Sequence, residues 1–440
     1  MITVGTLTKI AVVISVIAYR SARVAKNTIL TKHPFPEGYY SEGNFDIDCT
    51  TLKAPDLKYC EDATFWNLLD AQGKFIDRGL LISCDANRKA WNTVMGPLTD
   101  PAPHGSLWLH EPASNTGKRN AKPDAAKLKR IELKGYPAQH DFHPLGIEIY
   151  PSYAGNASNL YVINHARART VIEHFTLSPS SPTVATHVRT LASPYFHSAN
   201  SLALTSPDSF YVTNDHLFTR RIPYLGHVLP ILESVLALPL TFVSHITLSP
   251  SSSSAENAKA PITAHEFSAL FLAFPNGITI SPSGTQVAVA STTLGKVFIY
   301  TRNPATNALT TLAHTVEVPF TPDNMHYTHD GTALIVAGHP NFPALAKVAA
   351  NKTDVAPSWV VQIAIDGEEV KEAEFDRDAP VSAKGKVKSV PGFAVKTLFQ
   401  SDGVGFSSSS TGLKDPVTGA LYVTGLYAEE GVLVCRPSLK

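Results

Sequence analysis

The stretch FPNGITISPSG, from Phe274 to Gly284, places an asparagine before a glycine, a short β-branched strand and a Ser-Pro-x-Gly turn. The same plan recurs elsewhere in the chain. It is found in HPLGIEIYPSYAGNASNLYVIN (143–164), HSANSLALTSPDSFYVTN (197–214) and DNMHYTHDGTALIVAG (323–338). Short strands and turns that repeat about every fifty residues are typical of β-propeller blades. The repeat therefore predicts an all-β propeller.

Within this repeat, Leu145, Asn200, Asn276 and Asn324 occupy the equivalent position. In a propeller the innermost strand of each blade lines a central channel, and equivalent positions of different blades converge at one end of it. We therefore expect the side chains at these positions to lie close together. An asparagine before a glycine also commonly serves only the geometry of a turn, and that interpretation stays open for each one taken singly.

The composition bounds the class of protein. The chain has 440 residues, of which 44% are hydrophobic and 17% charged, which is ample for a large core. Lysine and arginine together equal aspartate and glutamate at 37 each, so the chain carries no electrostatic footprint for nucleic acid. The 32 prolines and 26 glycines are scattered, as many turns between short strands require.

The N-terminus differs from the rest. KIAVVISVIAY (9–19) is an apolar run followed by arginines and a lysine. Its length and flanking charges predict a signal peptide or signal anchor within residues 1–30, and the lack of a clean cleavage site favours the anchor. A buried helix of the globular domain is the weaker alternative, because the run precedes every strand-like unit. Either signal directs the predicted propeller, residues 45–440, into the secretory pathway, where it is extracellular or anchored on the lumenal or extracellular side.

Sequons and cysteines agree with that compartment. Asn156 and Asn351 are glycosylation acceptors in NAS and NKT tripeptides. Of the four cysteines, Cys49 and Cys435 lie near the two ends of the globular part, where a disulfide would staple the first strand to the last. Cys60 and Cys84 either pair or remain free. Buried apolar thiols are the alternative for all four.

The repeat also gathers oxygen ligands. Two or three amide oxygens and two or three carboxylates around one channel make an all-oxygen cage of the kind that calcium requires. Zinc would favour histidine or cysteine ligands instead. The sequence therefore predicts a calcium-binding tunnel, with candidate ligands Glu61, Asp62, Asn200, Asn276, Asp323 and Asn324.

Several longer motifs carry a resemblance to a known family. NFDIDC, CEDATFW, HPLGIEIY, LYVINHARARTVIEHF, YFHSANSLAL, FYVTNDHLF, FPNGITISPSG, PDNMHYTHDG and VAGHPN follow one another in the order found in the serum paraoxonase/arylesterase family. The chain resembles this family from about Cys49 to Cys435. The resemblance implies a six-bladed propeller with two calcium ions in its tunnel and a disulfide joining its ends. It also implies hydrolysis of lactones and aryl esters, and in some members of organophosphate triesters.

The resemblance assigns roles to individual residues. It implies that Asp62 and the backbone carbonyl of Ile147 hold the structural calcium, and that His165 is the outer member of the family's histidine dyad. The ligands that it implies for the catalytic calcium are Glu61, Asn200, Asn276, Asp323 and Asn324.

Two positions depart from the family. Leu145 stands where the family has the inner, water-activating histidine, and Ser201 stands where an aspartate serves the structural calcium. The sequence therefore leaves open both the second ion and the identity of the general base. Glu61 is one candidate base. His143, two residues before Leu145, is another, although a packing role at the pocket rim suits it better.

The predicted function is calcium-dependent hydrolysis of a small lipophilic ester or lactone. No Gly-x-Ser-x-Gly motif is present, which disfavours a serine hydrolase. The apolar segment 220–240, within an insertion at 220–262, predicts a helix that covers the pocket. That segment and residues 9–19 are also candidates for contact with a membrane or lipid surface. The alternative function is a calcium-stabilised binding propeller without efficient catalysis, because Leu145 replaces a histidine.

Overall fold

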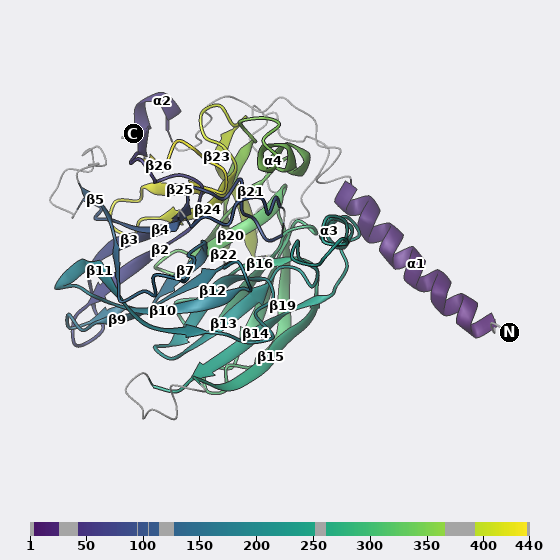
Figure 1. Ribbon diagram of the computed structural model, residues 1–440, viewed down its shortest axis with the longest axis horizontal. Coiled ribbons are helices and arrows are strands. Elements are labelled where there is room, and N and C mark those ends of the chain that lie inside the picture. Colours follow the sequence, from purple (N-terminus) through teal and green to yellow (C-terminus); the bar gives the residue numbers. More distant parts are fainter. Residues whose placement is uncertain are drawn as a thin grey trace.

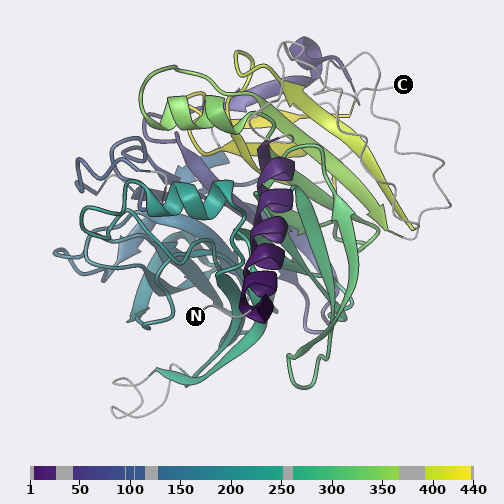
Figure 2. The same ribbon diagram turned by 90° about the vertical axis from the view of Figure 1, so that its right-hand side faces the viewer.

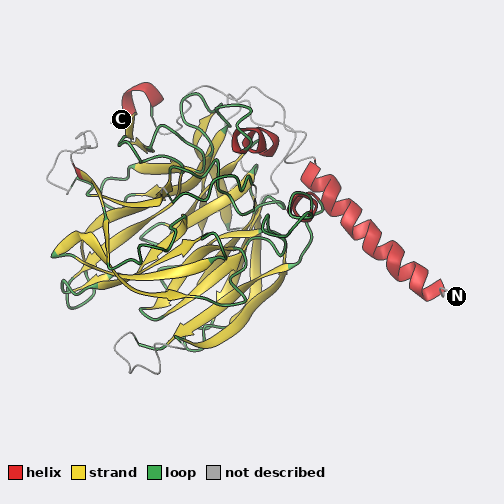
Figure 3. Ribbon diagram, viewed as in Figure 1, coloured by secondary structure: helices red, strands yellow, loops and turns green. Residues whose placement is uncertain are grey.

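The computed structural model describes residues 4–25, 43–94, 96–103, 105–113, 127–250, 261–365 and 392–437 of the chain. Strands dominate this part of the chain, as Figure 3 shows. The described strands form six sheets of four or five strands each. Each sheet is one blade of a ring, so the predicted six-bladed β-propeller is confirmed (Figure 1).

The first half of the chain builds three blades. Blade 1 contains β2 (Cys60–Leu69), β3 (Phe75–Asp85), β4 (Gly105–His110) and β5 (Leu128–Arg130), with β8 (Ser152–Tyr153) beside β2. Blade 2 contains β7 (Pro144–Ile149), β9 (Ser158–Asn164), β10 (Val171–Ser178) and β11 (Ser181–Leu191), with β6 (Glu132–Lys134) at its outer edge. Blade 3 contains β12 (Ala199–Ser206), β13 (Ser209–Asn214), β14 (Thr241–Leu248) and β15 (Ile262–Leu272).

The second half builds the other three. Blade 4 contains β16 (Pro275–Ile280), β17 (Gln286–Ser291), β18 (Lys296–Arg302) and β19 (Leu309–Glu317). Blade 5 contains β20 (Thr321–Tyr327), β21 (Ala333–His339), β22 (Ser358–Ile365) and β23 (Phe393–Ser401). Blade 6 contains β24 (Ser409–Lys414), β25 (Leu421–Gly425) and β26 (Val432–Cys435), and it is completed by β1 (Cys49–Leu52) from the start of the globular part.

Blade 6 closes the ring. β1 pairs antiparallel with β26, and the register sets Cys49 opposite Cys435. These two cysteines form the predicted disulfide. Cys60 and Cys84, whose state the sequence left open, form a second disulfide between β2 and β3. The described part of the chain contains no free cysteine.

The hydrophobic core lies between the blades. Six clusters of buried apolar side chains each join two neighbouring blades, and the cluster between blades 4 and 5 includes Val297, Leu334 and Trp359. The inner strands β2, β7, β12, β16, β20 and β24 contact one another in this order around the channel. The period of the sequence repeat is therefore the length of chain that one blade needs.

Each inner strand breaks register at the same point. The first residue of each inner strand, or a residue near it, pairs with the second strand of its blade, and the pairing register then shifts. In β16, for example, the shift follows Pro275. The breaks follow Cys60, Pro144, Ala199, Pro275, Pro322 and Ser409. Bulges re-aim side chains beside functional sites. The residues at the bulges are Glu61, Leu145, Asn200, Asn276, Asp323 and Ser410, so Asp323 rather than Asn324 is the register equivalent of Asn276.

Helices are few in the described chain. α1 (Val4–Val24) projects away from the propeller, and α2 (Phe45–Asp48) precedes β1 (Figure 1). α3 (Leu229–Val235) and α4 (Phe342–Ala349) both lie to the left of α1 in Figure 2, with α4 above α3. Residues 26–30 of the predicted leader and 251–260 of the predicted insertion lie outside the described residues.

The N-terminal helix is exposed rather than buried. By length and composition, Gly5–Ala22 can cross a membrane, although a signal sequence satisfies the same criterion. Because the segment Gly5–Ala22 is not buried, the alternative that the apolar run is a core helix is excluded. Only the C-terminal end of α1 packs on the propeller, where Val24 contacts Ala237 and Ala273. The sequon residues Asn156 and Asn351 are both exposed.

The bulges require close contact between inner strands, which Gly277 permits. A Cβ atom at position 277 would lie 2.7 Å from Asn324 Cα and 2.8 Å from Asp323 O. We expect Gly277→Ala to lower the free energy of unfolding by about 3 kcal/mol, because two backbones must separate. Gly155→Ala is the control, since its Cβ meets nothing and only its positive φ adds strain. Urea denaturation measures both, and an equal cost at the two positions would contradict the crowding argument.

Candidate functional site

A cavity of about 60 Å³ lies at the end of the channel where the inner strands begin. Side chains from all the first five blades reach it. Its polar lining consists of Glu61, Arg88, Asn92, His165, Asn200, Asp215, Asn276, Thr292, Asp323 and His339. The cavity therefore brings together most of the residues that the sequence predicted for the catalytic calcium. Asn324 lies beside it and bonds to one of the lining residues.

The three asparagine amides have a fixed orientation. Asn276 Nδ2 donates to Thr292 Oγ1 at 3.2 Å, and Asn324 Nδ2 donates to Glu61 Oε1 at 2.8 Å. Asn200 Nδ2 lies 3.3 Å from Asp215 Oδ2. The carboxylates are acceptors only, and the Thr292 hydroxyl uses its hydrogen on Pro322 O at 2.7 Å. Each amide must therefore turn its nitrogen outward and leave its oxygen for another partner.

Those oxygens have no donor. Buried atoms without a hydrogen-bond partner among the described residues include Oδ1 of Asn200, Asn276 and Asn324, and Oε2 of Glu61. Buried polar atoms are paired in the large majority of cases, so four unpaired acceptors around one cavity need an explanation. A cation is a partner that satisfies several oxygens at once, without any hydrogen.

Charge points the same way. Burial, then the carboxylates of Asp62 and Asp323, raise the pKa of Glu61 well above its usual value. The positive charge of Arg88, whose guanidinium bonds to Tyr59 O and Pro144 O, acts on the pKa of Glu61 in the opposite direction. Among the described residues, no three His, Cys, Asp or Glu side chains make a metal site of their own. The amide oxygens are what complete this donor set, and hard cations such as calcium accept it.

A second row of residues supports the first. A residue at the end of the second strand of a blade, or directly after it, contacts the tunnel-facing residue on the first strand: Asp215 contacts Asn200, Thr292 contacts Asn276, and His339 contacts Asp323. Sequence reasoning missed Asp215, Thr292 and His339 as site residues. Their signal was available, since a polar residue directly follows each of the second strands β13 and β17 and His339 ends β21.

One ring nitrogen of His339 makes a hydrogen bond within the described structure, and the other does not. Its Nε2 lies 2.8 Å from Asp323 Oδ2, and the aspartate is an acceptor, so Nε2 carries the hydrogen. Its Nδ1 is buried without a partner among the described residues. The ring lines the cavity, and only 4% of the residue is exposed. The arrangement presents a free lone pair at the site.

The remaining wall is apolar. It is formed by Trp91, Val94, Leu145, Phe274, Phe342, Leu345 and Leu426. The helix that contributes to it is α4, through Phe342 and Leu345. The sequence had assigned this role to the segment 220–240, but that segment is absent from the described lining. Its side chains Leu225, Val228 and Ile231 are instead about half exposed to solvent.

Comparison with known proteins identifies the family. The arylesterase family model matches residues 104–374, which is more than half of the chain. The chain belongs to the arylesterase family. Human serum paraoxonase/arylesterase 1 is 28% identical over 200 residues, which cover 46% of this chain and 50% of that protein.

Two further relatives give the same picture. Serum paraoxonase/lactonase 3 of Rattus norvegicus is 28% identical over 216 residues, covering 49% of this chain and 54% of that protein. Serum paraoxonase/arylesterase 2 of Gallus gallus is 27% identical over 220 residues, covering 50% and 54%. The chain spans about half the length of the curated relatives it matches.

Within this family member, His165 has no nitrogen to spare. Its Nε2 donates to Ala199 O at 2.7 Å, and its Nδ1 lies 2.7 Å from Thr93 Oγ1. Burial, then the charge of Arg221, lower the pKa of His165 to about 4. Leu145 lies in the cavity wall where the family pattern has the inner histidine, and it packs into the core between blades 2 and 3.

His143 is turned away from the cavity. Its Nδ1 lies 2.9 Å from Asp85 Oδ2 and its Nε2 lies 3.2 Å from Pro101 O, while the ring stacks on Trp91 at 5.5 Å. It is not among the cavity-lining residues. These contacts are those of a packing residue, which was the alternative weighed for it on sequence grounds.

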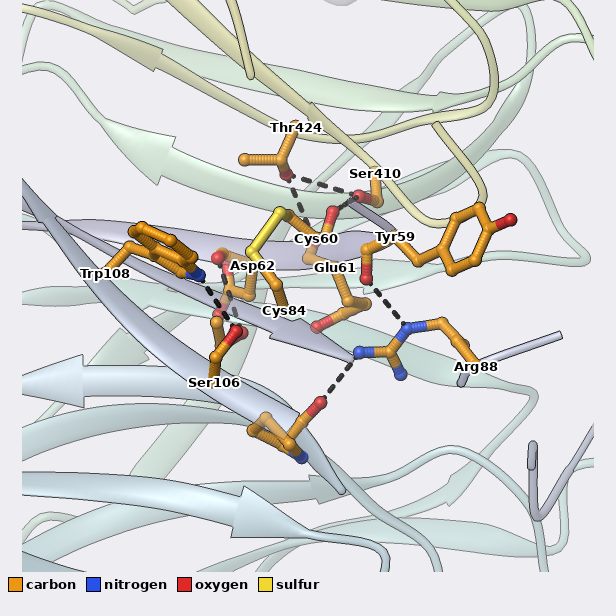
Figure 4. The surroundings of a disulfide bond; sticks show 12 residues. Tyr59, Cys60, Glu61, Asp62, Cys84, Arg88, Ser106, Trp108, Ser410 and Thr424 are labelled. Atoms are coloured by element: carbon orange, nitrogen blue, oxygen red, sulfur yellow. Dashed lines mark hydrogen bonds between the residues drawn. A yellow bond between two sulfur atoms is a disulfide. The ribbon is translucent and has the colours of Figure 1, made fainter. Parts of the chain in front are cut away.

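The Cys60–Cys84 disulfide lies beside the site. Figure 4 shows it next to Glu61, with Arg88 reaching toward the same region from the other side. Cys60, the first residue of β2, pairs with Cys84 directly before the bulge at Glu61. The bond therefore fixes the strand pair from which the candidate ligand projects.

Two adjacent threonines test whether the second row matters. Thr292 Oγ1 accepts from Asn276 and donates to Pro322 O, whereas Thr293 Oγ1 has no partner among the described residues, and both residues are buried. Thr292→Val should lower the free energy of unfolding by about 2 kcal/mol, because it strands an amide and a carbonyl. Thr293→Val should be neutral or slightly stabilising. Thermal or urea unfolding of the two variants decides, and equal effects would refute the supporting role.

Proposed function

We propose that this chain is a calcium-dependent hydrolase of lactones and aryl esters. The observation that carries the proposal is the set of four buried, donorless oxygens at the tunnel end of an arylesterase-family propeller. Its substrate is a small lipophilic ester or lactone. Organophosphate triesters are a further substrate class, since their phosphoryl oxygen offers a metal the same kind of ligand.

Five side chains would hold the ion: Glu61, Asn200, Asn276, Asp323 and Asn324. When bound, calcium supplies a Lewis acid that polarises the ester carbonyl and stabilises the oxyanion formed on it. The chain's own residues fix the geometry of that cage. The second-row contacts from Asp215 and Thr292 hold the amide oxygens inward before any ligand arrives.

His339 is the proposed general base. Its Nδ1 accepts a proton from the attacking water while the water oxygen bonds to the carbonyl carbon. Asp323 keeps the ring in the tautomer with hydrogen on Nε2. The bond from the carbonyl carbon to the alkoxy or aryloxy oxygen then breaks, and Nδ1–H returns its proton to the leaving oxygen. Glu61 is a poorer base because an ion that it binds lowers its basicity.

The apolar wall selects the substrate class. Leu145, Phe274 and Leu345 offer no hydrogen bond to an acyl chain or an aromatic leaving group and can pack against either one. A hydrophobic ester fits such a wall better than a charged one. A propeller that binds calcium and a ligand without turnover is the second candidate function, and the replacement of a family histidine by Leu145 is the observation that favours it.

We also propose a secreted or membrane-anchored protein with its propeller outside the cytoplasm. The exposed apolar helix α1 and two disulfides support this. Exposed apolar side chains support contact of the segment 220–240 with a lipid surface: Tyr224, Leu225, Val228, Ile231 and Leu232.

Removal of calcium tests the proposal. Purified protein should hydrolyse an aryl ester and members of a lactone panel, lose activity with a chelator, and regain it with added calcium. Asp323→Ala should abolish both calcium binding and turnover, because the site has few charged ligands. Asp85→Asn is the control, since the oxygens of that buried carboxylate already accept from Asn87 N and contact His143. Calcium binding without turnover of any ester would leave the binding propeller as the function.

The base is tested by a pair of histidine variants. His339→Gln should lower aryl-ester turnover by about 10²–10⁴-fold with calcium content unchanged. His165→Gln should have a far smaller effect, because a glutamine amide can still donate to Ala199 O. A large loss in His165→Gln and a small one in His339→Gln would return the role of base to His165.

A further inference from the structure

One step deeper in the channel, both carboxylate oxygens of Asp62 already accept hydrogen bonds from the protein. Its Oδ1 accepts from Ala63 N at 2.8 Å and lies 2.9 Å from Thr411 Oγ1. Its Oδ2 accepts from Ile147 N at 3.0 Å. A carboxylate has about four acceptor positions, so three are taken by hydrogen-bond donors. In addition, Nε2 of the His326 ring lies 3.8 Å from Asp62 Oδ1.

The side chains that hydrogen-bond around Asp62 are hydroxyls, whereas the carboxylates of Glu61 and Glu148 interact with it only through their charge. Ser201 stands on β12 at this level, and its Oγ accepts from Ile278 N at 3.4 Å. Ser83 Oγ donates toward the backbone carbonyls of Asp62 and Leu145. None of the side-chain oxygens of Asp62, Ser83 and Ser201 is buried without a partner in the described part of the chain. The contrast with the four donorless oxygens of the cage is complete.

A calcium ion does not fit this second position. It takes six to eight oxygens, and a carboxylate whose positions are occupied by N–H and O–H groups must first lose those bonds. Ser201 adds no charge to offset that cost. Asp62 and Ile147, predicted as structural-calcium ligands, meet instead through a hydrogen bond from the Ile147 amide nitrogen.

We propose that this channel binds one cation only, and that Asp62 joins the inner strands by hydrogen bonds where a second ion would otherwise join them. Asp62 on β2 bonds to β7 through Ile147 and to β24 through Thr411. One carboxylate therefore holds three inner strands together. That one cation binds in the channel rests on the proposed function. That hydrogen bonds take the place of a second ion rests on the Asp62 contacts alone.

Metal content separates the possibilities. Elemental analysis of wild-type protein, equilibrated with calcium and freed of unbound ion, should give one calcium per chain, lost in Asp323→Ala. Two calcium ions per chain would overturn this inference and leave the proposed function intact. No bound calcium would overturn the proposed function. Ser201→Asp restores a carboxylate at this level and should raise the content to two.

A stability measurement tests the Asp62 contacts without relying on Ser201→Asp to fold. Thr411→Val removes the bond to Asp62 and should lower the thermal midpoint by about 2 °C, by the same amount with calcium and with a chelator. Thr293→Val is again the control. A cost that vanishes when calcium is present would mean that an ion holds Asp62, and the inference would fail.

Discussion

Four side-chain oxygens buried without a donor are the constraint around which this propeller is organised. Each unsatisfied group costs about 1–3 kcal/mol, and here they converge on one cavity. Such a cluster persists only when the surrounding structure holds it, and a bound cation of the kind proposed would offset its cost. The bulges turn Glu61, Asn200 and Asn276 inward, and Asn324 directly follows the bulge residue Asp323. The glycines at 146 and 277 let the next strand come close enough to share the cavity.

Neighbouring blades are joined by a common kind of bond just behind the site. A hydroxyl on one blade donates to a backbone carbonyl on the inner strand of the next: Thr213 to Asn276 O, and Thr292 to Pro322 O. Ser83 does the same toward Leu145 O. Between blades 2 and 3 the donor is His165, which bonds to Ala199 O. In this chain His165 joins two blades, and both of its ring nitrogens are within hydrogen-bond distance of a protein atom.

The sequence alone was sufficient to predict those features for which a pattern of residues has only one structural interpretation. The repeat length predicted the blades, and the terminal cysteines predicted the closure, because both follow directly from chain geometry. Asn324 was assigned the register position of Asp323 because a bulge inserts a residue that no local pattern reveals. His339 was missed because it ends β21 whereas its partner Asp323 lies on β20, and only the fold brings them together. The apolar segment 220–240 was assigned to the pocket because hydrophobicity does not say which surface it faces, and α4 forms that wall instead.

The closure of the ring also dictates an order of events during synthesis. β1 and its partner β26 are separated by nearly the whole chain, and the cysteines that join them lie 386 residues apart. At ribosomal speed this is a delay of roughly 20–80 s, during which the first strand has no partner and blade 6 does not exist. Five blades must therefore wait as an open arc with two exposed edges. β26 is the strand that converts the arc into a ring, so a truncation that removes it leaves β1 without a partner and the ring open.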